Sequence, residues 1–184
     1  FATGVYTATV RRNSDRIQIL ASREGHAWGI PLTLKKKITL NAGENELEIA
    51  YFIEGLPQDR DLHFGVEWNF AGLPDDQQDR FFSDSQGEKL GDLGSTLSLE
   101  DSLRIYLTDQ WLGLEIELAS DQAGGIFAYP VQTVSQSESG FELVHQSVCV
   151  QPHWQIKGDA NGCWACRINF KLNAEVTAAN QKSS

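Results

Sequence analysis

Two cysteines, Cys163 and Cys166, stand at the CxxC spacing that redox and zinc motifs use. A tetrahedral zinc site needs a second pair of ligands, and a redox pair lies at the start of a helix that follows a strand. Neither context surrounds this pair in the sequence. The residues after Cys166 alternate like a strand, which sends the two sulfur atoms to opposite faces. We therefore interpret both cysteines as structural thiols.

The histidines are spread over four separate segments of the sequence. None has a second histidine at the HxH, HxxxH or HExxH spacing that sets two imidazoles on one metal ion. We therefore expect no metal and no other cofactor. With Cys149 the cysteines number three, which is too few for a disulfide framework and indicates reduced thiols in a cytoplasmic setting. The histidines are His26, His63, His145 and His153.

Carboxylates cleave glycosidic bonds when two of them stand on either side of the scissile bond, one protonated and one ionised. The candidates are Glu67, on an otherwise apolar strand, and the pair Glu115 and Glu117, on the polar side of another. Solvent-facing strand positions are the simpler explanation for all three. We therefore assign no acid/base pair and predict no catalytic residue.

Tryptophan binds sugars by stacking its indole on the C–H face of the ring, while nearby amides and carboxylates bond the hydroxyls. Of the five tryptophans, Trp111 lies beside a turn and Trp154 follows Pro152, so these two are the candidates for exposure. Trp68 alternates with apolar neighbours and is expected in the core. Core packing is the alternative for Trp28, Trp111, Trp154 and Trp164 alike.

The segments that carry these residues alternate between apolar and polar side chains, as strands with one buried face do. Residues 63–70 are the clearest case. Turn residues at 13–15 and 41–45 predict hairpins. Residues 71–94 are rich in Asp, Gln, Gly, Ser and Pro, and predict a long loop with a short turn near 80–82. Residues 121–125 predict a break between strands.

The pattern as a whole predicts an all-β protein. No segment longer than about 10 residues keeps a 3.6-residue apolar period, and turn signals recur every 8–12 residues or so. The length of 184 residues suits one domain, which we place at residues 1–172, with a frayed tail over 173–184.

Composition narrows the classes of partner. Apolar residues make up 41% of the chain and charged residues 22%, which is typical of a globular core. A net charge of -10 argues against nucleic acid and anionic membrane surfaces as partners. No stretch approaches the roughly 20 apolar residues of a membrane span. The chain begins at Phe1 and contains no Met, which suggests a fragment of a longer polypeptide.

The run TVSQSESGFELVHQS at residues 133–147, followed by Pro152-His153-Trp154, resembles the C-terminal domain of glycoside hydrolase family 57. This is the family of α-amylases and 4-α-glucanotransferases. Residues 63–70, 109–115 and 31–40 support the resemblance and keep the order of the family over nearly the whole chain.

The resemblance implies an antiparallel β-sandwich of the galactose-mutarotase-like, or supersandwich, type. In the full-length protein this sandwich would pack against an N-terminal catalytic (β/α)₇ barrel. The family's catalytic Glu and Asp lie on that barrel, and no residue of this chain matches either motif. The chain itself is therefore expected to be non-catalytic.

Three hypotheses of function remain open. The first is an accessory domain that supports the barrel and binds α-glucan through the polar run at 132–138 and the polar face of the strand at Glu67. The second is a mutarotase- or lyase-like sugar enzyme that uses His63, Glu67 or His145 as acid or base. The third is a structural domain without a ligand. The candidate carbohydrate-binding residues are Glu67, Asn69, Trp111, Gln132, Ser135, Gln136, Glu138 and Trp154.

Overall fold

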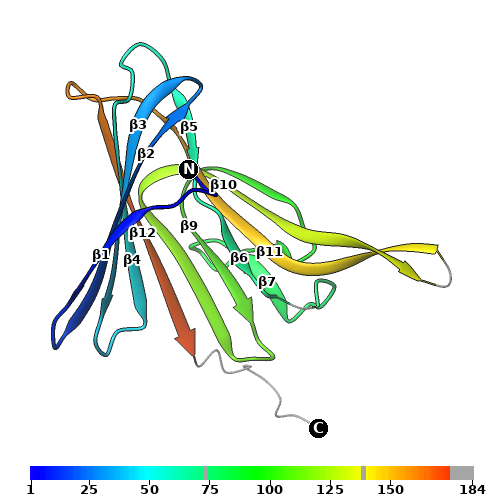
Figure 1. Ribbon diagram of the computed structural model, residues 1–184. Coiled ribbons are helices and arrows are strands. Elements are labelled where there is room, and N and C mark those ends of the chain that lie inside the picture. Colours follow the sequence, from blue (N-terminus) through cyan, green and yellow to red (C-terminus); the bar gives the residue numbers. More distant parts are fainter. Residues whose placement is uncertain (73, 138–139, 175–184) are drawn as a thin grey trace, which may run out of the picture. The chain divides into compact units, whose positions relative to one another are not determined.

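The computed structural model describes residues 1–72, 74–137 and 140–174. Within them the chain forms twelve strands, and neighbours along the chain such as β1–β2, β2–β3, β3–β4 and β10–β11 pair antiparallel (Figure 1). The all-β prediction is confirmed. The strands are β1 (Thr7–Arg12), β2 (Arg16–Ala27), β3 (Ile30–Asn41), β4 (Glu46–Glu54), β5 (Leu62–Gly65), β6 (Trp68–Phe70), β7 (Arg80–Ser83), β8 (Lys89–Asp92), β9 (Leu97–Asp109), β10 (Leu114–Ser137), β11 (Gly140–Ile156) and β12 (Cys163–Ala174).

The chain forms two compact units, and the assignment of residues 1–172 to one domain stays a prediction. Unit 1 comprises Phe1–Phe64, Leu118–Gln122 and Gln155–Leu172. Unit 2 comprises Gly65–Glu117, Ala123–Trp154 and the described residues from Asn173. Strand β12 includes Asn173 and Ala174, the start of the predicted tail, and residues 175–184 lie outside the described part of the chain.

Unit 1 is built on the strand order β1-β2-β3-β4-β12. Its register places Ile19, Ile38, Ile49 and Ile168 opposite one another in a single row across four strands. Branched side chains in such cross-strand pairs pack closely, and Ile49 and Ile168 are buried. This row forms the centre of the apolar side of the sheet.

The hairpins of unit 1 follow from their turn residues. Asn13 donates its backbone N–H to the carbonyl of Arg16 at 2.9 Å, which closes the predicted β1–β2 turn. The β2–β3 turn contains only Trp28 and Gly29, with φ of 52° and 80°. Positive φ at both positions is the type I′ geometry of two-residue hairpins. Trp28 takes one of them, and its side chain is 89% exposed at the tip of the hairpin.

Unit 2 follows the order β8-β7-β9-β10-β11-β6. Its core includes Phe82 of β7, Leu93 after β8, and Val148 of β11, all fully buried. Residues 71–94 therefore differ from the predicted loop, because they contain both β7 and β8. These strands have four residues each, too short to show an alternating pattern, and β7 is fixed by its pairing with β9, where Phe82 stands opposite Leu107.

Strand β10 also differs from the prediction, since it runs through residues 121–125 without a break. The glycines there serve close packing rather than a turn. A Cβ atom at Gly124 would come within 2.5 Å of the Trp154 ring, and one at Gly125 within 2.2 Å of the His153 ring. Glycine lets these two side chains lie directly over the strand.

The part of the chain that the structure describes contains no helix of the length and hydropathy needed to cross a membrane.

Candidate functional site

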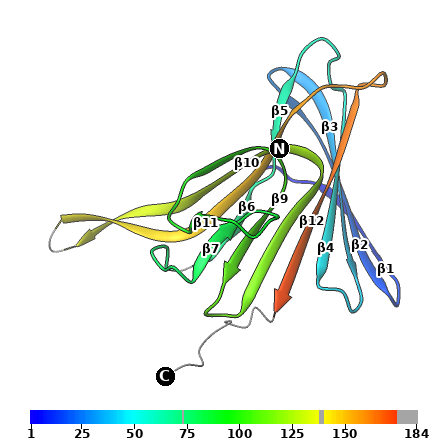
Figure 2. The same cartoon turned by 180° about the vertical axis from the view of Figure 1, so that it is seen from behind.

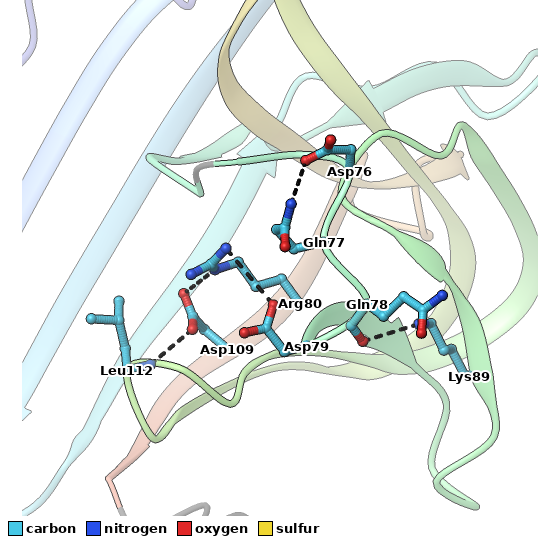
Figure 3. A network of polar contacts seen from close by, with 8 residues as sticks. All are labelled: Asp76, Gln77, Gln78, Asp79, Arg80, Lys89, Asp109 and Leu112. Carbon is cyan, nitrogen blue, oxygen red and sulfur yellow. Dashed lines mark hydrogen bonds and ion pairs between the residues drawn. The ribbon is translucent and has the colours of Figure 1, made fainter.

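The turn between β9 and β10 presents Trp111 to solvent, with 73% of its surface exposed. Asp109 closes this turn, because its Oδ1 accepts a hydrogen bond from the backbone N–H of Leu112 at 2.9 Å (Figure 3). The backbone N–H of Gln110 donates to the carbonyl of Asp79 at 2.9 Å. Two bonds therefore hold the turn that carries the indole.

Arg80 of β7 supports the same turn and is itself buried. Its Nε donates to Asp109 Oδ2 at 3.1 Å, and its Nη1 lies 3.8 Å from Asp79 Oδ1 (Figure 3). The guanidinium carbon lies 5.4 Å from the centre of the Trp111 ring, within the range of a cation–π contact. A buried ion pair thus fixes the orientation of an exposed indole.

This arrangement suits a ligand that has one apolar face and several hydroxyls. The side of Trp111 that Arg80 does not approach is available for stacking. The side chain of Asp79 is 40% exposed and Gln110 is exposed. An indole flanked by a carboxylate and an amide is the combination that recognises a sugar ring. We call Asp79, Gln110 and Trp111 the Trp111 site.

A second polar surface surrounds Glu67 and Asn69. The amide of Asn69 donates to Glu67 Oε1 at 2.7 Å, and both residues are exposed. Asn69 stands opposite Cys149, which stands opposite Tyr129, so these residues share one face across three strands. The hydrogen bond between Tyr129 and Cys149, together with burial, raises the pKa of Tyr129 to about 12. The phenol therefore stays protonated at neutral pH.

The same face continues with His153. Its ring stacks on Phe127, with centroids 4.0 Å apart and planes inclined by 22°. The next residue, Trp154, points to the opposite face and is buried. Trp154 thus packs in the core, which is the alternative that the sequence left open.

The other sequence candidates lie on the projecting part of the β10–β11 hairpin, apart from Glu138, which lies outside the described residues. Gln132, Ser135 and Gln136 are all exposed. Gln132 and Gln136 share one face of the hairpin, and Ser135 stands on the other. The described sequence candidates are therefore spread over the β9–β10 turn, the Glu67 and Asn69 surface, the arm of the hairpin and the core.

Of the residues proposed for a mutarotase- or lyase-like enzyme (His63, Glu67 and His145), His145 has structural contacts at both nitrogens of its ring. His145 is held by structural contacts, with Nε2 2.8 Å from the carbonyl of Gly72 and Nδ1 3.3 Å from Asp75 Oδ2. This pair joins β11 to the segment before β7.

The carboxylates Glu115 and Glu117 are also bonded within unit 2. Glu117 Oε1 accepts hydrogen bonds from Arg104 Nη1 at 3.0 Å and from the Tyr106 hydroxyl at 3.2 Å. Glu115 accepts one from the amide of Asn173 at 3.3 Å. Both side chains therefore have partners inside the sheet.

The cysteines are free thiols. Cys163 stands opposite Glu54 and Cys166 opposite Tyr51, three positions apart on β12. Alternation along the strand puts them on opposite faces, as the sequence predicts. Among the described residues, no three His, Cys, Asp or Glu side chains gather to form a metal site.

Thiol reactivity is expected to separate Cys163 from the other two cysteines. Cys149 and Cys166 are buried, and burial raises the pKa of both, that of Cys166 to about 12. Cys163 is half-buried, and desolvation, then Asp159 and Glu54, raise its pKa. Because the thiolate is the reactive form, Cys163 should be alkylated alone, more slowly than a free cysteine at pH 8, and faster as the pH rises.

Mass spectrometry after iodoacetamide treatment measures this. Asp159→Asn removes the charge but keeps Oδ1, which accepts hydrogen bonds from the backbone of Asn161 and Cys163. Faster alkylation of Cys163 is expected in that variant. Equal labelling of all three thiols in the folded chain would contradict the assignment.

Comparisons with known proteins agree on one family. The model of the alpha-amylase/4-alpha-glucanotransferase C-terminal domain matches residues 1–168. Alpha-amylase 1 of Dictyoglomus thermophilum is 26% identical over 171 residues, which are 90% of this chain and 23% of that protein. This chain therefore spans about a quarter of that relative.

Two solved structures share the fold. The 4-alpha-glucanotransferase from Thermococcus litoralis matches with a TM-score of 0.58 and 17% identity, over 89% of this chain and 22% of that one. A galactose mutarotase-like protein from Lactobacillus casei matches with a TM-score of 0.55 and 10% identity, over 91% of this chain and 73% of that one. The predicted mutarotase-like fold type is thereby confirmed.

The family match covers more than nine tenths of the chain, and the relatives extend well beyond it. The chain belongs to the family of C-terminal domains of α-amylases and 4-α-glucanotransferases.

Proposed function

We propose that the chain is a non-catalytic accessory domain of an enzyme that acts on α-glucans, and that it supports a catalytic domain in the same polypeptide. The match of residues 1–168 to a C-terminal domain family carries this proposal. The chain spans 23% of the Dictyoglomus thermophilum α-amylase and 22% of the Thermococcus litoralis glucanotransferase. Most of each relative therefore lies outside this domain.

The bonding of the carboxylates supports a catalytic centre outside this domain. Glycoside cleavage needs two carboxyl groups that face each other across the scissile bond. Glu117 is paired with Arg104, Glu115 with Asn173, and Glu67 bonds Asn69. The sequence prediction that no residue here is catalytic is retained in this proposal.

Direct contact with the glucan is the second part of the proposal, and the Trp111 site supports it. An exposed indole would be free to rotate on a flexible loop, and stacking would then carry a cost in side-chain entropy. Here the Arg80–Asp109 pair holds the turn before any ligand arrives. The Glu67 and Asn69 surface adds a second place where hydroxyls would find a carboxylate and an amide.

We also place the protein in the cytoplasm, where free cysteines such as these persist. Neither a nucleic acid nor a membrane is part of the proposal.

The full-length protein tests the enzyme context. It is expected to shorten or redistribute maltoheptaose, which chromatography of the products measures. The 184-residue chain alone serves as the control and should leave maltoheptaose unchanged. A full-length protein inert toward maltoheptaose, amylose and starch would contradict the proposal, and so would activity of the chain alone.

A further inference from the structure

Strands β10 and β11 extend beyond the rest of unit 2 as a two-stranded ribbon, drawn in yellow in both views (Figures 1 and 2). We call its described residues, 132–137 and 140–145, the β10–β11 arm. The register sorts the arm into two faces, because paired residues share a face and successive residues alternate. One face contains the pairs Val134–Leu143 and Gln136–Phe141, and the other contains Thr133–Val144 and Ser135–Glu142.

The first face of the arm carries an apolar stripe that is open to solvent, flanked by the exposed amides of Gln132 and Gln136. Val134, Leu143 and Phe141 are 68%, 67% and 78% exposed. A two-stranded ribbon has little stability of its own in water, and neighbouring exposed apolar side chains mark contact surfaces. Of the two faces of the arm, the stripe would therefore be stabilised most by a partner that covers it.

The base of the arm is held firmly. His145 is bonded to the carbonyl of Gly72 and paired with Asp75, and its side chain is buried. A register shift between Val131 and Gln132 marks the point where the arm leaves the sheet. Such irregularities redirect a strand, so the arm departs at a set angle. A partner would meet a preformed surface, which lowers the entropy cost of binding.

The chemistry of the stripe favours a protein as its partner. Among the described arm residues, the acidic side chain is that of Glu142, which lies on the face opposite the stripe. The centre of a protein interface is typically depleted of charge, whereas a nucleic-acid surface needs clustered cations. The stripe also lacks the carboxylates that a sugar-binding surface would present.

We propose that the apolar stripe docks on the catalytic domain of the same polypeptide. This rests on the proposed function, in which that domain precedes the present chain. The relatives supply the argument for the occupant, since about three quarters of the Dictyoglomus thermophilum and Thermococcus litoralis chains lie outside the matched region. A covalently joined domain stands at a high effective concentration, which favours it over a free partner or a second copy.

Photo-crosslinking in the full-length protein tests the docking. The photoreactive residue p-benzoylphenylalanine is placed at position 141 on the stripe, or at position 142 on the opposite face as the matched control. Position 141 is expected to cross-link to the upstream domain with a yield at least about tenfold above position 142, and the yield should not fall on dilution, because the contact is intramolecular. Mass spectrometry of the cross-linked peptides identifies the partner.

Three outcomes would overturn the docking proposal. Cross-links between two copies, whose yield falls on dilution, would make a second chain the occupant. Equal yields at 141 and 142 would remove the role of the stripe, and an absence of cross-links would leave the arm in solvent. Activity on maltoheptaose is assayed in the same samples, so an active enzyme without the cross-link rejects the docking alone. A cross-linked but inactive protein rejects the enzyme assignment alone.

Discussion

Arg80→Leu is expected to lower the free energy of unfolding by about 3 kcal/mol or more, since breaking a buried ion pair leaves one charge without a partner. The side chains of Arg80 and Asp109 are only 7% and 12% exposed. Leucine keeps part of the apolar volume of arginine, so the loss comes mainly from the stranded Asp109 carboxylate. Urea unfolding of the 184-residue chain, followed by circular dichroism, measures the change.

Two further variants separate this effect from a general loss of contacts. Adding Asp109→Asn to Arg80→Leu removes the stranded charge and keeps an oxygen to accept the Leu112 N–H, so the double variant should recover part of the stability. Arg104→Leu breaks a more exposed pair, in which the side chains are 44% and 16% exposed, and should cost about 1 kcal/mol or less. If Arg80→Leu and Arg104→Leu lowered the free energy of unfolding equally, the buried Arg80–Asp109 pair would not have the stabilising role proposed for it.

The hairpins of unit 1 could be predicted from the sequence because local chemistry determines them. Asn13 and Asp15 lie in the turn that closes β1 and β2, and turns of this kind depend on the residues within them. The alternation along β3 and β4 extends over many residues, so the periodic signal is strong. Local and long-range preferences agree in this part of the chain.

The support beneath Trp111 could not be predicted in the same way. Arg80 lies 29 positions before Asp109, and their pairing depends on β7 joining β9. No short spacing marks such a contact. The sequence pattern predicts a loop around Arg80, and an arginine in a loop is expected to be solvated. Its burial depends on the pairing of β7 with β9, which the sequence pattern does not show.

The burial of Trp154 and the exposure of Trp111 could both have been predicted from the sequence. Val150, Pro152, Trp154 and Ile156 occupy alternate positions of β11, and all four are buried. Trp111 lies in a turn, outside any alternating run, and a turn position is where a large aromatic residue stays exposed.

Trp111→Ala is expected to weaken binding of maltooligosaccharides to the 184-residue chain by roughly thirtyfold, or about 2 kcal/mol, if the indole is the stacking surface. The expected size follows from the preformed turn, because a ring already held by Arg80 gives up little freedom on binding. Isothermal titration calorimetry with maltoheptaose measures the dissociation constant.

The chain provides its own control in Trp28, which is 89% exposed on the β2–β3 turn of unit 1. Trp28 is an exposed indole too, but it is not one of the residues of the Trp111 site, so Trp28→Ala should leave the affinity unchanged. Similar losses in both variants would mean that sugars bind exposed indoles without selectivity. Arg80→Lys adds a finer test, since lysine keeps the charge but not the planar fork that bonds Asp109. A loss of affinity in that variant, with Trp111 intact, would show that the orientation of the indole matters as well as its presence.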